Sequence, residues 1–240
     1  MSDNNNIFLI TGPPSSGKTS SLWFLDNPDK YVYLNTDRKP VPFKDKFLVS
    51  ASVDEPLDML DYLDQVELND DAEGVVIDTL TFMMDMFETL HVVNSSDTRA
   101  AWGEYAQFYK SFIHKMKSGK KKYILIAHEE VALNAKTNQY ESKVPIKGAV
   151  GRTGAEADFT TILAAREVET WMLEPYANDL LNITEEEEED GIKRVFVTRI
   201  NKVITGNKMR SAMGLWDRKE LFIDNNAQFV LNRLEEYYGE

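Results

Sequence analysis

The sequence contains no cysteine, and only three of its 240 residues are histidine. This absence excludes disulfides, thiolate zinc sites and cysteine nucleophiles, and it leaves little material for a transition-metal site. We therefore expect any bound metal to be a hard cation held by oxygen atoms. The chain also lacks an apolar run of 18 or more residues, and its first apolar stretch, residues 7–11, is short. These features predict a cytoplasmic protein without a membrane span or a secretory signal.

Positive charge is scarce overall and is concentrated in two stretches. The formal net charge of -13 argues at first against nucleic acid, because an acidic surface repels a phosphate backbone. Residues 110–152, however, hold ten Lys or Arg against three acidic residues, and residues 193–210 hold six against none. Two interpretations are open: these stretches steer an anionic ligand, or they are solvated faces of an acidic protein.

Short apolar runs alternate with amphipathic stretches, which is typical of an α/β fold with a mainly parallel central sheet between helices. The pattern predicts strands at residues 7–11, 31–35, 47–50, 74–78 and 122–128. It predicts helices at 17–25, 56–66 and 99–117, the last with aromatic residues at three- and four-residue spacing that we assign to the core. Because no linker or internal repeat is visible, we expect residues 1–240 to form a single domain.

The second half of the chain predicts an antiparallel extension of the sheet. Residues 129–156 have the composition of a long loop, and strands are expected at 159–166, 193–200 and 221–223. The six consecutive acidic residues at 185–190 repel one another and predict a solvated hairpin tip. Asn225 or Asn226 can cap a closing helix that ends near Tyr238.

The strongest motif is Gly12-Pro13-Pro14-Ser15-Ser16-Gly17-Lys18-Thr19, which matches the phosphate-binding P-loop without a departure. It follows an apolar strand and opens a predicted helix, so its backbone amides can converge on phosphate groups. Lys18 is expected to reach the β- and γ-phosphates of ATP, and the Thr19 hydroxyl to bind Mg²⁺. The residues predicted to contact the nucleotide are Gly12, Ser15, Ser16, Gly17, Lys18, Thr19 and Ser20.

Polar residues at other strand ends supply candidates for the remaining steps of ATP hydrolysis. Asp78 ends an apolar run and is the predicted second magnesium residue, on a strand next to that of the P-loop. Asp37 and His128 also fall at the carboxyl edge of the sheet, where ligands of such sheets bind. They are candidates to activate water and to sense the γ-phosphate, with Glu129 and Glu130 as second candidates. Each of these residues could instead be an ordinary polar strand end.

These motifs, in this order, resemble the core of a RecA-like ATPase. The stretch 33–37 resembles the strand that ends in a catalytic carboxylate, with Asp37 where RecA proteins have Glu. The stretch 124–128 resembles the strand that ends in a γ-phosphate sensor, which is a histidine in the RadA branch. Residues 147–158 resemble the end of the second DNA-binding loop, and residues 199–216 resemble a hairpin directed at a neighbouring subunit's nucleotide.

The resemblance covers about residues 7–223 and implies a function. Only eleven residues precede Gly12, so the match is to a minimal core without a polymerisation segment, most similar to phage single-strand annealing recombinases. It implies an ATPase, DNA-stimulated and cytoplasmic in a phage host, that needs ATP and Mg²⁺ and assembles as a ring or filament. Its implied partners are single-stranded DNA and a single-stranded DNA-binding protein.

Two groups of basic residues are assigned to these partners. Residues 134–152 are long, nearly free of acids and begin shortly after His128, so Lys136, Lys143, Lys147 and Arg152 are predicted to bind DNA. Lys208 and Arg210 are predicted to contact the nucleotide of a neighbouring subunit, as the resemblance implies. For Lys208 and Arg210, solvated charges or additional DNA contacts are the alternative.

Two other functions use the same P-loop. A small-molecule kinase would need a basic lid over a phosphate acceptor, and residues 136–152 could form one. A nucleotide-gated adaptor or loader that hydrolyses little ATP would fit the short side chain of Asp37.

Overall fold

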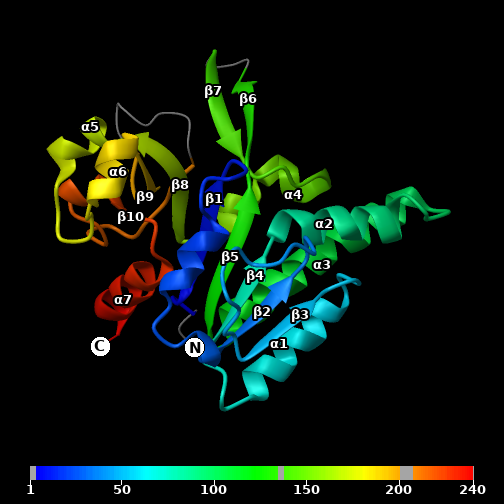
Figure 1. Cartoon of the computed structure of the whole chain (residues 1–240). Coiled ribbons are helices and arrows are strands. Elements are labelled where there is room, and N and C mark those ends of the chain that lie inside the picture. The colour runs from blue at the N-terminus through cyan, green and yellow to red at the C-terminus, as the bar shows by residue number, and fades with distance from the viewer. Residues whose placement is uncertain (1–3, 135–137, 201–207, 240) are drawn as a thin grey trace.

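The computed structural model describes residues 4–134, 138–200 and 208–239 (Figure 1). Within these ranges eight strands form one sheet in the order β10-β9-β8-β1-β5-β4-β2-β3, and β6 and β7 form a separate hairpin. The strands are β1 (Ile7–Gly12), β2 (Tyr31–Asn35), β3 (Val49–Ser52), β4 (Gly74–Asp78), β5 (Lys122–His128), β6 (Glu130–Asn134), β7 (Gln139–Lys143), β8 (Thr161–Glu169), β9 (Ile192–Val197) and β10 (Phe222–Asp224).

The sheet has a parallel part and an antiparallel part. The strands from β3 to β8 pair in parallel, whereas β9 runs antiparallel to both β8 and β10. The predicted fold class, a mainly parallel sheet flanked by helices with an antiparallel C-terminal extension, is confirmed. One detail was wrong: β5 lies between β1 and β4, so the strand of Asp78 is not adjacent to that of the P-loop.

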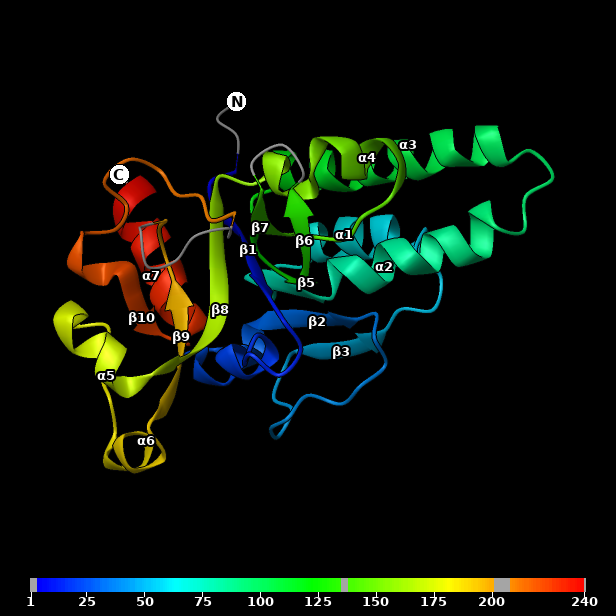
Figure 2. The same cartoon turned by 90° about the horizontal axis from the view of Figure 1, so that it is seen from above.

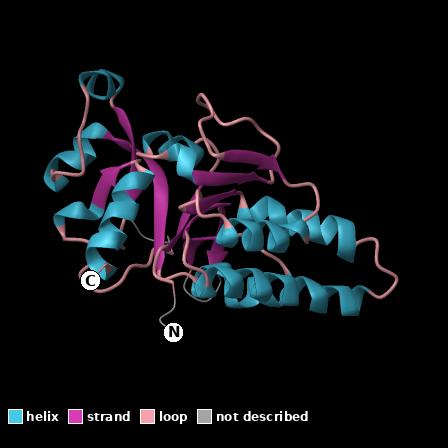
Figure 3. Cartoon of the chain, turned by 90° about the horizontal axis from the view of Figure 1, so that it is seen from below, coloured by secondary structure: helices cyan, strands magenta, loops and turns pink. Residues whose placement is uncertain are grey.

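Helices cover both faces of the sheet. The α-helices are α1 (Asp58–Leu68), α2 (Leu80–Phe87), α3 (Thr98–Ser118), α4 (Gly148–Thr153), α5 (Thr170–Leu173), α6 (Glu185–Asp190) and α7 (Ala227–Tyr238). Five short 3₁₀-helices, η1 (Thr19–Phe24), η2 (Pro28–Lys30), η4 (Ala155–Asp158), η5 (Glu174–Tyr176) and η6 (Lys219–Leu221), and the π-helix η3 (Glu88–Val92), complete the described elements. Helices α1, α2 and α3 pack on one face, and η1 and α7 on the other (Figures 2 and 3).

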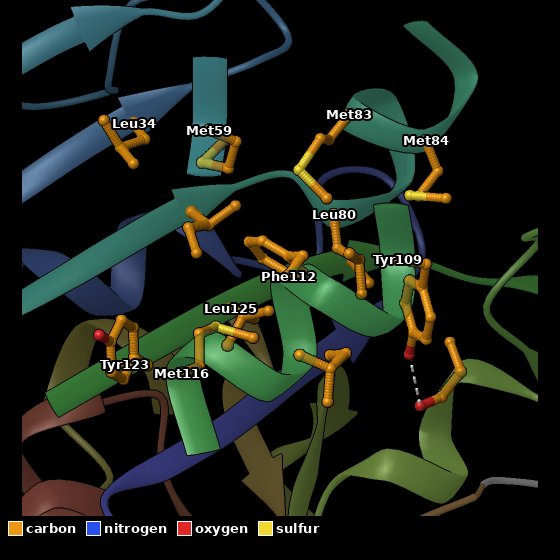
Figure 4. Packing of buried hydrophobic residues seen from close by; sticks show 14 of the residues in the cluster. Leu34, Met59, Leu80, Met83, Met84, Tyr109, Phe112, Met116, Tyr123 and Leu125 are labelled. Carbon is orange, nitrogen blue, oxygen red and sulfur yellow. Dashed lines mark hydrogen bonds between the residues drawn. The ribbon is translucent and has the colours of Figure 1, made fainter. Parts of the chain in front are cut away.

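The parallel strands are apolar on both faces, as a sheet covered on both sides requires. In β1, Ile7 and Leu9 face the core formed with α1 to α3, and Phe8 and Ile10 face the core formed with η1 and α7. Figure 4 shows the first of these cores, where Phe112 of α3 packs near Leu125 of β5. The central strands are thereby fixed, and their carboxyl ends meet at one edge.

Helix positions were predicted most accurately for amphipathic helices, which have one polar and one apolar face. The helix predicted at 99–117 is α3, capped by Asp97, whose side chain accepts a hydrogen bond from the Ala100 amide at 3.0 Å. Its aromatic side chains Tyr105, Phe108, Tyr109 and Phe112 are buried in the core as expected, and Trp102 is partly buried against it. Helix α2 was not predicted, because it is only eight residues long and most of these residues are apolar. In the described residues, none of the helices combines the length and apolarity that crossing a membrane requires.

Two predicted elements in the first half were inaccurate. The helix expected at 17–25 is only the short 3₁₀-helix η1, because Leu25 is already extended and a turn with Pro28 follows. The strand expected at 47–50 is shifted to β3, which pairs with β2 through the register Val32↔Val49.

The segment expected to be one long loop, residues 129–156, is largely helix and strand in its described residues. It contains the β6–β7 hairpin, which projects from the body of the molecule (Figure 1), and helix α4. The hairpin was missed because its charged and small residues lack a strong apolar alternation, while cross-strand pairs such as Leu133↔Tyr140 hold it together.

The acidic run is a helix and not a hairpin tip. Residues 185–190 form α6, where Thr184 and Glu187 make a reciprocal capping box and Gly191 ends the helix with a φ of 71°. Acidic residues are favourable in the first turn of a helix, and the Lys193 ammonium lies 2.9 Å from Glu187 Oε2. These contacts lower the pKa of Glu187 against the opposing effect of its burial.

The other C-terminal elements agree with the sequence to within a few residues. The expected strands at 159–166, 193–200 and 221–223 are β8, β9 and β10, with β9 ending earlier, at Val197. Asn226, one of the two candidate caps, accepts a hydrogen bond from the Gln228 amide at the start of α7.

Candidate nucleotide site

The P-loop joins β1 to η1 and turns through two left-handed positions. Ser15 and Gly17 have φ angles of 66° and 89°, a region that glycine adopts at little cost. The Ser16 hydroxyl donates to the Pro13 carbonyl at 2.9 Å and closes the turn. The loop thus has the compact shape that lets backbone amides surround an anion.

The C-terminal extension packs directly on this loop. Asn225, which follows β10, donates from Nδ2 to the Gly17 carbonyl at 2.7 Å. A Cβ atom at Gly17 would lie 2.6 Å from that Nδ2 and 2.9 Å from Cδ of Arg194 on β9. Glycine is therefore required at position 17 both by its backbone angle and by the close approach of two side chains.

The charge of the P-loop lysine is held inside the loop. Lys18 Nζ donates to the carbonyl oxygens of Gly12 at 2.9 Å and Pro13 at 2.7 Å, and the residue is only 6% exposed. Burial lowers the pKa of Lys18 to about 8, although the nearby carboxylates Asp78 and Glu129 act in the opposite direction. Lys18 is thus a buried cation that an anionic ligand would stabilise.

Asp78 is a buried carboxylate bonded by two hydroxyl groups. Its Oδ2 accepts hydrogen bonds from Thr19 Oγ1 at 2.7 Å and from the Tyr33 hydroxyl at 2.9 Å. Burial raises the pKa of Asp78, and the two hydrogen bonds counteract this shift. Thr79, which follows Asp78, is held by the Thr36 hydroxyl. That hydroxyl donates a hydrogen bond to the Thr79 carbonyl and accepts one from the Thr79 amide.

The Thr19 and Asp78 oxygen atoms fit a magnesium ion that is bound together with phosphate. Across the described ranges, no group of three or more acidic or histidine side chains could hold a metal by itself. Magnesium sites in nucleotide-binding proteins commonly use one or two protein oxygen ligands, substrate phosphates and water. The two side chains present suit this arrangement.

Asp37 lies at the cavity wall after β2 and is 13% exposed at its side chain. Its Oδ1 accepts from the Lys39 amide at 2.9 Å, and its Oδ2 lies 3.5 Å from Lys39 Nζ. Asp37 therefore lines the same cavity as Asp78, but it has hydrogen-bond partners of its own and is not bonded to Thr19 or Tyr33 in the way that Asp78 is.

His128 ends β5 directly beside Gly12 and also lines the cavity. Its Nε2 atom is buried and has no hydrogen-bond partner among the described residues. Burial lowers the pKa of His128, and the nearby Lys18 and Lys39 lower it further against the opposing effect of Asp37, so the site favours the neutral ring. A buried ring nitrogen without a partner at a cavity wall is a suitable contact for a ligand.

The two second candidates are bonded elsewhere. Glu129 Oε2 lies 2.7 Å from Arg166 Nη2, and the Glu129 side chain is only 6% exposed. Glu130 pairs with Lys143 at 3.0 Å across the base of the hairpin. Neither residue lines the cavity, so Asp37 is the better-placed carboxylate.

One cavity of about 400 Å³ brings these groups together. Its polar and charged lining is Ser15, Lys18, Thr19, Ser20, Tyr33, Asp37, Lys39, Asp78, Thr79, His128 and Arg194. Gly17 also lines it, Ser16 is buried beneath the loop, and Gly12 accepts the Lys18 bond. Next to it, sharing Ser20 and Pro42, is an apolar groove formed by Trp23, Phe24 and Phe43.

Sequence reasoning missed several lining residues, among them Tyr33, Lys39, Thr79 and Arg194. Lys39 lies two residues after Asp37, so its proximity could have been inferred, and Tyr33 is on the same strand and face as Asn35. No local signal points to Arg194, because its position depends on the pairing of β9 with β8. The P-loop lysine is therefore not the single cation of this cavity.

Three of the four predicted DNA-binding residues are described, and they lie on β7 and at helix α4. Lys143 ends β7, Lys147 precedes α4 and pairs with Glu88 at 2.7 Å, and Arg152 is exposed on α4. Lys136 lies outside the described residues. The side chains of Val131, Leu133 and Tyr140 are all more than half exposed on the hairpin.

The predicted intersubunit residues lie away from the chain's own nucleotide cavity. Lys208 is exposed, and Arg210 forms a backbone bridge with Ile162. The Arg210 guanidinium donates from Nη1 to the Ala157 carbonyl at 3.3 Å. Neither residue lines the cavity that contains Lys18.

The two basic stretches are less positive in the fold than in the sequence. Acidic residues from other segments pair with many of their cations: Lys115 with Asp64, Lys117 with Asp158, Lys122 with Glu235, Lys147 with Glu88, Lys193 with Glu187 and Arg194 with Glu167. Charge counts along the sequence therefore overstate the local field.

Comparison with known proteins identifies one family. A family model described as "AAA domain" matches residues 4–150, which include the P-loop, Asp37, Asp78 and His128. Among solved structures, the chain is similar to a KaiC-like protein from the hyperthermophilic archaeon Pyrococcus horikoshii OT3, at 15% identity and a TM-score of 0.46. That similarity covers 87% of this chain and 82% of the other. No curated protein matches the sequence.

The Gly17→Ala substitution should disrupt the loop. The added Cβ would force Asn225 away and place alanine in a left-handed conformation that costs about 1–2 kcal/mol. We expect a lower free energy of unfolding in urea and loss of nucleotide binding. Gly103→Ala, at an open position within α3, is the matched control and should stabilise the protein by about 0.5–1 kcal/mol. Parent-like stability and binding of Gly17→Ala would contradict this account of the loop.

Proposed function

Because this chain belongs to the AAA domain family of P-loop ATPases, we propose that it hydrolyses ATP and couples this reaction to binding of single-stranded DNA. The observation that supports the proposal best is the convergence of Lys18, Thr19, Asp78, Asp37 and His128 on one cavity. These side chains come from the P-loop and from the ends of β2, β4 and β5.

Each side chain has a role that its position suits. Lys18 would exchange its carbonyl partners for oxygen atoms of the β- and γ-phosphates, and His128 Nε2 would contact the γ-phosphate. Asp37, which is not bonded to Thr19, would orient and deprotonate the attacking water. Thr19 and Asp78 would hold magnesium, which neutralises charge on the phosphates when it is bound. The aromatic groove beside Ser20 offers stacking faces for the base.

The DNA part of the proposal rests on the β6–β7 hairpin. The hairpin begins two residues after the His128 position, and it carries an exposed aromatic ring, Tyr140, on a ribbon that projects from the body. Stacking on such rings is how many proteins bind unpaired bases without sequence preference. The ion pair of Lys143 with Glu130 is about half exposed on both sides, so a DNA phosphate can replace that carboxylate at little cost. The Lys147 side chain is also more than half exposed, although its partner Glu88 is largely buried.

A role in phage recombination, as an annealing or strand-pairing protein, would follow from these two activities. ATP-bound subunits would assemble into a ring or filament on DNA, where a single-stranded DNA-binding protein is a further expected partner. The exposed positions of Lys208 and Arg210 suit a contact between subunits.

The Lys18→Ala variant should lose ATP binding and hydrolysis while it keeps its fold, because a charge-assisted contact to phosphate is removed. Asp78→Asn should weaken the dependence of activity on magnesium. Phosphate release and nucleotide titration measure both effects, with exposed Lys219→Ala as the control. ATP hydrolysis by Lys18→Ala at the parent rate would show that the site is assigned wrongly, and phosphate transfer to a small acceptor would favour a kinase.

Neutralising Lys136, Lys143, Lys147 and Arg152 together should weaken binding of single-stranded DNA. The slope of log affinity against log salt should fall by roughly 0.7 for each lost phosphate contact. Tyr140→Ala should cost about 1–3 kcal/mol if the ring stacks on a base. Fluorescence anisotropy with labelled oligonucleotides measures both, and neutralising four exposed cations elsewhere, Arg99, Lys110, Arg218 and Lys219, is the matched control for charge. Unchanged affinity and salt slope in the quadruple variant would rule out the hairpin as the DNA site.

A mixing experiment tests the intersubunit role of Lys208 and Arg210. Lys18→Ala keeps both cations but has an inactive site, and the double variant Lys208→Ala/Arg210→Ala keeps the site. If the cations act across a subunit boundary, the mixture should recover part of the lost ATPase activity, since a cation supplied by a neighbour can contribute about 10³- to 10⁵-fold in rate. Absence of recovery, with specific activity independent of protein concentration, would exclude this model.

A further inference from the structure

Arg194 lies at the nucleotide cavity although it belongs to the antiparallel extension. It lines the cavity together with Lys18, Thr19 and Asp78. Its side-chain stem passes close to Gly17, because an ideal Cβ on that glycine would be 2.9 Å from Arg194 Cδ. The chain therefore brings a guanidinium group to its own P-loop.

The position of this arginine is fixed by the backbone on both sides. Strand β9 lies between β8 and β10, and the pair Val195↔Asp224 places the end of β10 beside Arg194. The next residue, Asn225, donates its hydrogen bond to the Gly17 carbonyl. The extension and the loop are thus joined at the point where Arg194 enters the cavity.

The guanidinium group is engaged in a weak and replaceable ion pair. Glu167 and Arg194 face each other across β8 and β9, and Glu167 Oε1 lies 3.1 Å from Nε and 3.0 Å from Nη2. Both contacts go to one carboxylate oxygen, and Nη1 is not part of the pair. The two side chains are 52% and 47% exposed, so the pair contributes little to stability.

The other cations of the cavity are not equivalent. Lys39 is 71% exposed, and its ammonium stays 3.5 Å from Asp37, whereas Lys18 is buried in the P-loop. A planar guanidinium binds phosphate oxygen atoms in a forked geometry that an ammonium group cannot reproduce. Arg194 is therefore the cavity residue best suited to recognise a phosphate group by shape and charge together.

We propose that Arg194 binds a phosphate oxygen of the nucleotide held by the same subunit, and that Glu167 competes with the nucleotide for this guanidinium. The inference rests on the nucleotide binding proposed above and adds a cation that acts within one chain, unlike Lys208 and Arg210. The substrate class it favours is a nucleoside di- or triphosphate over a monophosphate, since an additional phosphate supplies the acceptor.

Titration calorimetry with a non-hydrolysable ATP analogue and with AMP, both with magnesium, tests this role. Arg194→Gln keeps most of the stem that packs on Gly17 but removes the charge, and it should weaken binding of the analogue on the order of ten- to a hundredfold. AMP binding should change much less. Arg194→Lys should restore only part of the affinity, because the fork is missing. Arg218→Ala, at an exposed position outside the cavity, is the matched control.

A double-mutant cycle tests the role of Glu167. Glu167→Gln should bind the analogue several times more tightly than the parent, because the competing carboxylate charge is removed. This gain should disappear in the Glu167→Gln/Arg194→Gln protein, since no guanidinium is left to release. An equal gain in both backgrounds would show only a general effect of negative charge and would overturn the competition.

The outcomes separate this inference from the proposed function. If the parent binds no nucleotide, or if Lys18→Ala binds as the parent does, the function itself fails. If Lys18→Ala loses binding while Arg194→Gln, with parent-like circular dichroism and melting, keeps parent affinity, only the role of Arg194 fails. A mixture of Lys18→Ala and Arg194→Gln should regain no ATPase activity, and recovery would show that Arg194 acts on a neighbour.

Discussion

The buried carboxylate of Asp78 is the contact on which the geometry of the site depends. A single oxygen atom accepts from Thr19 at the P-loop and from Tyr33 on β2, so three segments of the chain meet at one atom. Burying a carboxylate is costly unless such partners are present. The requirement to satisfy Asp78 therefore sets the distance between the P-loop and β4, although β5 lies between their strands.

A second junction holds the P-loop from the other side. Asn225 bonds to the Gly17 carbonyl, and the buried start of α7 follows immediately. The antiparallel extension is thus part of the nucleotide site, because its strand order brings both Asn225 and Arg194 against a loop more than 170 residues earlier in the sequence. A change in the backbone of the loop would alter the position of the extension, and the reverse also holds, since a buried hydrogen bond joins them and little space separates them.

The sequence predicted the structure best where a single residue type is needed for a local reason, such as a tight turn, a strand end or one face of a helix. The P-loop, the strand ends at Asp37, Asp78 and His128, and the amphipathic α3 could be located because glycine, carboxylates and apolar spacing each have a local meaning. Helix α6 was misread because like charges suggested repulsion, while the cap at Thr184 and the pairing with Lys193 decide the conformation. Arg194 could not be found, because strand pairing between distant segments leaves no local pattern.

The cations of the cavity explain how a chain with a net charge of -13 can offer a site for a polyanion. Three cations line the cavity: Lys18 of the P-loop, Lys39 after β2 and Arg194 of β9. Each of them already contacts protein oxygen atoms. A phosphate that takes over these contacts provides acceptors of higher charge, so hydrogen bonds are exchanged at little loss while Coulomb attraction increases. The protein oxygen atoms released by this exchange belong to β1, β2 and β8 and the segments beside them. Nucleotide binding would therefore alter contacts in both the parallel core and the extension. Through these contacts, the bound phosphate could influence the conformation of segments outside the cavity.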